Sequence, residues 1–121
     1  ELTAVSERAA RRNDVHAHIT WRSVRAKSLA QRGAFVEAEE LSREAIEYAA
    51  TGDFLNAHGD ALLSLAVVLE LAGRPEEAIP AVEEALHLYE RKGNVVSAAR
   101  SAELLKHLAG RPRGDNGRGR A

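Results

Sequence analysis

Residues 73–86 read GRPEEAIPAVEEAL, and residues 33–46 read GAFVEAEELSREAI. Aligned without gaps, the second stretch is a degenerate copy of the first: Gly, Glu, Ala, Glu and Ala recur at matching places, 40 residues apart. A fixed period of this kind indicates stacked structural units rather than one closed core. The sequence therefore predicts a short solenoid of antiparallel helical hairpins, and stacks of this kind present a surface for binding.

The composition favours an all-α domain. The 121 residues suffice for one domain, and 45% of them are apolar, mainly Ala, Leu and Val, while aromatic residues are few. Absence of Cys excludes disulfides, thiol catalysis and cysteine-bound metal. The first residue is Glu1 rather than Met, so we expect a piece of a larger protein.

Neither a membrane span nor a signal peptide is expected. The longest apolar run, residues 61–71, is broken by Ser64 and Glu70 and is too short to cross a bilayer. Charged residues near the N-terminus leave no apolar segment of the kind that signal peptides carry. We therefore expect a soluble, cytoplasmic chain.

Charge is unevenly distributed along the sequence. Seven basic residues and one acidic residue lie between Arg8 and Arg32, whereas thirteen acidic and two basic residues lie between Gly33 and Glu90. One interpretation is that complementary helix surfaces meet within the stack. The other is an electrostatically polarised binding surface.

Helix start and stop signals divide the chain into five to six helices. We expect residues 1–12 to be a helix of a truncated preceding repeat, 13–52 and 53–93 to be two repeats, 94–110 a capping helix and 111–121 a disordered Gly/Arg tail. Asn13-Asp14, Thr51 or Asp53, and Asn94 are expected N-caps, and Gly33, Gly73 and Gly93 are expected helix stops. Pro75 suits a first helical turn, whereas Pro80 predicts a local bend or a late start.

The apolar stripes predict which helix faces point inward. Leu62, Leu65, Ala66 and Leu69 form the clearest stripe, with spacing typical of an amphipathic helix. The other expected inward positions are Val15, Ile19, Ala26 and Leu29, widened by Trp21 and Val24; Ala38, Leu41, Ala45, Tyr48 and Ala49; and Ala98, Ala102, Leu105, and Leu108 or Ala109.

No catalytic or metal-binding pattern stands out. His16 and His18 are two residues apart, so on a helix they point roughly 200° apart and cannot hold one ion together. Single glycines end helices here and form no phosphate-binding loop, and the glutamate pairs fit exposed helix positions. We expect no enzyme activity, no cofactor and no metal.

The repeated positions resemble the tetratricopeptide repeat (TPR) family. Small residues where helices cross, with a glycine at the turn, are Ala26, Gly33, Ala38 and Ala45 in one unit and Ala66, Gly73, Ala78 and Ala85 in the next. The resemblance implies a right-handed solenoid. The sequence departs from the family in its longer repeat and in Arg22 and Arg25, which occupy positions where the family has large apolar residues.

A narrower resemblance concerns WRSVRAK (residues 21–27), DFLN and HGDALL (53–56 and 58–63) and YERKGN (89–94), which are similar to the C-terminal repeats of large bacterial adenylate/guanylate cyclase-type, ATP-binding regulators. That similarity implies a regulatory signalling module. Any ATP or cyclase chemistry would belong to sequence outside this chain.

In the TPR family, the first helix of each hairpin lines a concave groove. The positions that the resemblance implies here are Thr20, Ser23, Lys27, Ala30, Gln31, Asp60, Leu63, Val67, Glu70, Leu71, Ser97, Arg100 and Leu104. They lack the Lys and Asn set that captures a peptide C-terminus in some relatives. Leu63, Val67 and Leu71 either anchor a partner or are covered by the helix over residues 94–109.

The expected function is a protein-interaction or scaffold module, whose partner is a protein or peptide, including other domains of a parent chain. The alternatives are an intramolecular cap with no ligand of its own, and weak nucleic-acid binding through Arg8–Arg32 and the tail. Self-association through an open end of the stack is a further possibility.

Overall fold

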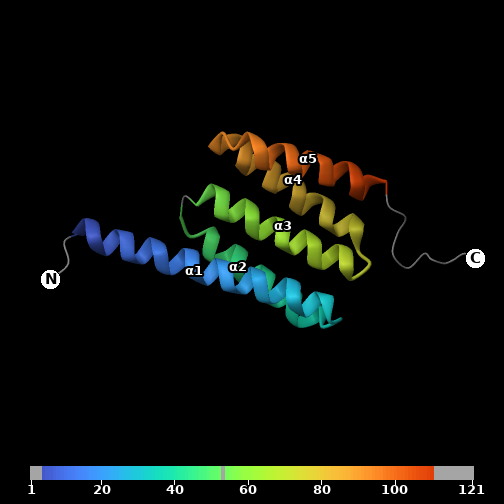
Figure 1. Ribbon diagram of the computed structural model, residues 1–121, viewed down its shortest axis with the longest axis horizontal. Coiled ribbons are helices and arrows are strands. Elements are labelled where there is room, and N and C mark those ends of the chain that lie inside the picture. Colours follow the sequence, from blue (N-terminus) through green and yellow to red (C-terminus); the bar gives the residue numbers. More distant parts are fainter. Residues whose placement is uncertain (1–3, 53, 111–121) are drawn as a thin grey trace, which may run out of the picture.

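Five α-helices form the protein in the computed structural model, which describes the backbone of residues 4–52 and 54–110 and the side chains of residues 14–52 and 54–110. They are α1 (Ala4–Gln31), α2 (Phe35–Ala49), α3 (Leu55–Leu71), α4 (Pro75–Lys92) and α5 (Val95–Ala109). Consecutive helices pack side by side, and α1 also contacts α3 (Figure 1). The described part of the chain contains no strand, so the expected all-α class is confirmed.

Three glycines end helices in the way that the sequence predicts. Gly33, Gly73 and Gly93 have φ of 85°, 80° and 83°, a left-handed conformation that only glycine adopts without strain. At each of them the chain forms a Schellman motif; at the first, the Gly33 N–H bonds the Ala30 carbonyl and the Ala34 N–H bonds the Leu29 carbonyl. These tight turns make each following helix run back antiparallel to the one before it.

Helices α3 and α5 run in the same direction, with α4 antiparallel to both. Near their starts, the Asn94 amide donates to the Asn56 side chain at 3.0 Å. Near their ends, His107 Nε2 lies 2.7 Å from Glu70 Oε2. The first helix of one hairpin and the last helix therefore lie parallel.

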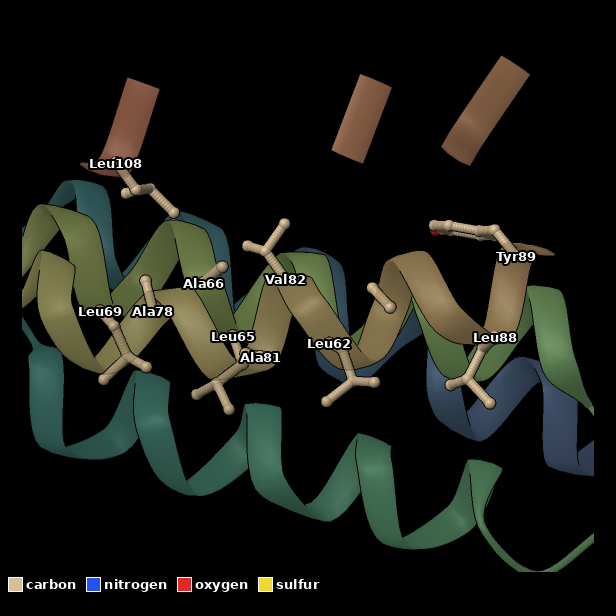
Figure 2. Packing of buried hydrophobic residues seen from close by; sticks show 11 residues of the cluster. Leu62, Leu65, Ala66, Leu69, Ala78, Ala81, Val82, Leu88, Tyr89 and Leu108 are labelled. Carbon is tan, nitrogen blue, oxygen red and sulfur yellow. The ribbon is translucent and has the colours of Figure 1, made fainter. Parts of the chain in front are cut away.

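The largest core cluster joins α3, α4 and α5. Leu62, Leu65 and Leu69 of α3 point toward α2, and Leu108 brings in α5 (Figure 2). Ala78 and Ala85 of α4 are fully buried, which lets α3 and α4 approach closely. Two smaller clusters bind α1 to its neighbours, one around Ala26, Leu29, Ala30, Ala38 and Val68, the other around Ile19, Ala45, Ala49 and Ala61.

The expected helix break at Asn13-Asp14 is wrong, because α1 continues through both residues. Asn and Asp cost only about 0.7 kcal/mol each relative to Ala inside a helix, and the preceding Ala and Arg residues are strong helix formers. No Gly or Pro enforces an end there. The division of the chain into repeats stays a prediction, and the expected tail lies outside the described residues.

Three smaller expectations are also corrected. Thr51 does not cap α3, since its hydroxyl donates to the Tyr48 carbonyl at the end of α2; Asp53 lies outside the described residues. Helix α4 begins at Pro75 and contains Pro80, so a late start is wrong. Trp21 and Val24 do not widen the inward face of α1, because they are 48% and 61% exposed.

Candidate interaction groove

An open hollow of about 340 Å³ lies between α1 and α3, and Arg100 of α5 also lines it. We call it the α1/α3/α5 groove. Its lining residues are His16, Ile19, Thr20, Ser23, Val24 and Lys27 of α1; Ala57, Asp60, Leu63, Ser64 and Val67 of α3; and Arg100 of α5.

The spacing of these residues explains why they face one way. On α1 they recur three or four residues apart, and so they form one stripe along the helix. The α3 residues follow the same rule. Ala26 and Ala61 are fully buried nearby. Because their side chains are small, α1 and α3 pack closely together beneath the groove.

An apolar floor lies beneath a polar rim. Ile19 is buried, Leu63 and Val67 are half-buried, and Val24 is 61% exposed at the edge. Thr20, Lys27, Asp60 and Arg100 are exposed, which places them at the solvent side of the hollow. An apolar surface with a few polar groups around it is typical of binding sites.

Asp60 is held in place by a buried tyrosine. The Tyr89 hydroxyl, from α4, donates to Asp60 Oδ1. Burial, followed by the hydrogen bond to Asp60, raises the pKa of Tyr89 well above its ordinary range, and Arg100 opposes this shift. The tyrosine thus remains a donor at neutral pH, and its hydroxyl holds one oxygen of the Asp60 carboxylate in place.

One side chain in the groove wall has an unmet hydrogen-bonding requirement. Ser23 is only 9% exposed, and its hydroxyl oxygen is buried with no hydrogen-bond partner. Ser42, on α2, is the other described serine in this state, but it does not line the groove. A buried polar group without a partner costs about 1–3 kcal/mol.

The structure brings together seven of the thirteen positions that the resemblance implied. Thr20, Ser23, Lys27, Asp60, Leu63, Val67 and Arg100 all line the groove.

The other six lie elsewhere, each for a local reason. Ala30 is buried in the cluster around Ala26 and Leu29, and Leu104 packs against the largest core cluster. Ser97 is buried in the first turn of α5, where its N–H bonds the Asn94 side chain. Gln31 and Leu71 are the last residues of their helices and are exposed, and Glu70 contacts His107.

Helix α5 does not cover all the expected apolar anchors. Leu71 is 47% exposed, but it lies outside the groove, whereas Leu63 and Val67 are half-buried within it. Leu63 also packs against the main core cluster. Leu63 therefore contributes both to the hydrophobic core and to the floor of the groove.

The sequence reasoning missed five lining residues: His16, Ile19, Val24, Ala57 and Ser64. His16 and Val24 lie four residues before Thr20 and after it, so extending the helical stripe would have found them. Ile19 was assigned to the core, and it is indeed buried there. A residue that serves both core and groove cannot be recognised from periodicity alone.

A second cluster explains the arginine at an apolar position. The Arg22 guanidinium lies over the rings of Trp21 and Tyr48, at 4.4 and 4.5 Å, and its Nε donates to Glu44 at 3.0 Å. His18 stacks on Tyr48 with ring centroids 4.7 Å apart. The arginine therefore replaces an apolar side chain by joining α1 to α2 through cation–π and ionic contacts.

Among the described residues there is no group of three His, Cys, Asp or Glu side chains that could bind a metal ion. No helix in the described ranges has the length and apolar character required to cross a membrane. No family model, curated protein or solved structure matches the chain.

Proposed function

We propose that this chain is a non-catalytic protein-interaction module and that the α1/α3/α5 groove is its binding surface. The observation that carries the proposal is the open hollow of about 340 Å³, with an apolar floor and a rim that contains Lys27, Asp60 and Arg100. Three separate helices supply this lining, so the surface depends on the folded arrangement rather than on one segment. An extended or helical peptide segment is the kind of partner that such a groove accepts.

Nucleic-acid binding is less well supported. Arg22, in the middle of the basic region, is engaged by Glu44 and by two aromatic rings, so it is not available to a phosphate. The groove itself contains Asp60 and an apolar floor, whereas nucleic-acid sites are strongly basic. Anisotropy of a labelled single-stranded oligonucleotide at low salt, where phosphate contacts are strongest, tests this rival.

The regulatory context of the proposal rests on the resemblance to bacterial cyclase-type regulators. In that context the partner segment belongs to another domain of the parent protein, and the module reports or controls its position. If the chain is only an intramolecular cap, the groove has no ligand, and no peptide will bind it.

The test selects peptides from a random phage-displayed library on the immobilised protein and then measures their Kd with purified variants. Val24→Arg places a long charged side chain at the groove edge, and Val36→Arg places the same side chain on α2, outside the groove. The two valines are 61% and 74% exposed, so neither change should harm folding. We expect the Kd to rise at least tenfold, about 1.4 kcal/mol, for Val24→Arg and to stay unchanged for Val36→Arg.

Two results would contradict the proposal: selection that enriches no peptide, and enriched peptides that bind both arginine variants as they bind the wild type. Thermal unfolding followed by circular dichroism confirms that both variants are folded to the same extent.

A further inference from the structure

The α1/α3/α5 groove carries a positive charge that the described residues do not neutralise. Lys27 is exposed and forms no ion pair with any described residue, and it lies one helical turn beyond Ser23. An acidic group of a ligand would therefore pair with Lys27 without first displacing a carboxylate of the protein. The inference about the ligand that follows from this charge rests on the proposed function of the groove.

Asp60 and Arg100 are the other charged residues of the groove lining. Asp60 is the one acidic residue of the lining, and it already accepts the Tyr89 hydroxyl. Arg100 lies close enough to Tyr89 to lower the pKa of that hydroxyl against the other influences. Its own guanidinium bonds only the Ser97 hydroxyl, at 3.3 Å. The lining therefore holds two cationic side chains, Lys27 and Arg100, and one acidic side chain, Asp60, so the groove has an excess of positive charge.

The Ser23 hydroxyl, a hydrogen-bond donor without a partner, is compatible with the same ligand chemistry. It lies in the groove wall with no partner, although a serine on a helix can bond the carbonyl one turn back. Beside a lysine, the natural partner for this donor is an anionic oxygen. A carboxylate in the groove would pair with Lys27, and the buried Ser23 hydroxyl would donate to the same carboxylate once it rotates toward the groove.

The apolar surface beside these two residues defines the rest of the ligand. Val24 precedes Lys27 by one turn, and Leu63 and Val67 form the facing wall on α3. An aliphatic side chain of the ligand fits this floor, at about 25 cal/mol for each Å² of apolar surface buried.

We infer that the partner of the groove is a polypeptide segment in which an aliphatic side chain is followed within one helical turn by an Asp or Glu side chain. The aliphatic group rests on Val24, Leu63 and Val67, and the carboxylate binds Lys27 and Ser23. Recognition uses an internal acidic side chain, so a free peptide C-terminus is not required.

The experiment uses the peptides selected as described above, synthesised with amidated C-termini so that side chains provide their only carboxylates. We expect most enriched sequences to contain an aliphatic and acidic pair. Replacing that acid with its amide, or Lys27 with Glu, should raise the Kd about tenfold or more. Arg25→Glu is the matched control, because Arg25 is exposed on the same helix but does not line the groove, and its Kd should stay within about twofold.

Ser23→Ala separates recognition from folding. Because the substitution removes an unpartnered buried hydroxyl, the protein should be as stable as the wild type or more stable. The same substitution should weaken binding of the acidic peptides about threefold to tenfold. A purely structural serine would leave the Kd unchanged.

The outcomes distinguish this inference from the function on which it rests. If peptides depend on Val24 but lack an acid and bind Lys27→Glu normally, the groove is the binding surface and the acidic ligand is wrong. If no enriched peptide depends on Val24, both the function and the inference are wrong. Enriched basic sequences would contradict the inference directly.

Discussion

Gly59 shows how one residue sets the spacing between α3 and α4 behind the groove. A methyl group added at this position would lie 2.7 and 2.8 Å from atoms of the Tyr89 ring, and that ring is fully buried. The ring cannot move without breaking its hydrogen bond to Asp60. Gly59→Ala should therefore lower the free energy of unfolding by about 1–2 kcal/mol, although alanine gains up to about 1 kcal/mol in helix propensity. Urea unfolding measures the difference.

The control is Gly110→Ala at the end of α5. There an added methyl group would lie 3.6 Å from the nearest atom, and φ is −89°, which alanine adopts readily. We expect no loss of stability. If Gly59→Ala is as stable as the wild type, the close approach of Tyr89 to α3 is not present in solution.

At the scale of the helices, α5 is positioned by Asn94. Its side-chain oxygen accepts the Ser97 N–H at 3.1 Å, as the sequence predicts for an N-cap, and its amide donates to Asn56 on α3 at 3.0 Å. Asn94→Ala should cost about 1–2 kcal/mol, because it removes both the cap and the link between α3 and α5. Thermal or urea unfolding provides the measurement.

Asn94→Asp keeps the cap acceptor and removes the amide donor, so it should lose only the part that the link to Asn56 contributes. The prediction requires aspartate to be intermediate in stability between asparagine and alanine. Equal stability of aspartate and alanine would mean that the cap contributes nothing.

Helix boundaries show which signals a sequence carries reliably. A glycine stop is decisive because the left-handed conformation is strained in other residues, and Gly33, Gly73 and Gly93 all adopt it. Asn94 caps as expected, but Asn13 and Thr51 do not. A capping side chain stabilises a helix start by only about 1 kcal/mol, so its neighbours decide whether the start forms.

At the scale of the whole molecule, the all-α class and most core positions follow from the apolar stripes. Packing decides the rest. Trp21 is exposed, and the Arg22 guanidinium lies over the Trp21 ring while it bonds Glu44 on α2, an arrangement that leaves no periodic pattern in the sequence. Lys27 and the other expected groove positions came from the resemblance to tetratricopeptide repeats, in which the first helix of each hairpin lines the groove, and not from periodicity. Asp60 was expected there, but its fixation by Tyr89 depends on a contact between residues 29 apart.

The central claim is that binding occurs at the face made by α1, α3 and α5. The most direct measurement is an NMR titration of the ¹⁵N-labelled chain with a selected peptide. We expect the largest amide shifts at Thr20, Lys27, Leu63, Val67 and Arg100, whereas the amides of Val36 on α2 and His87 on α4 should not shift. Largest shifts on the outer faces of α2 and α4 would contradict it.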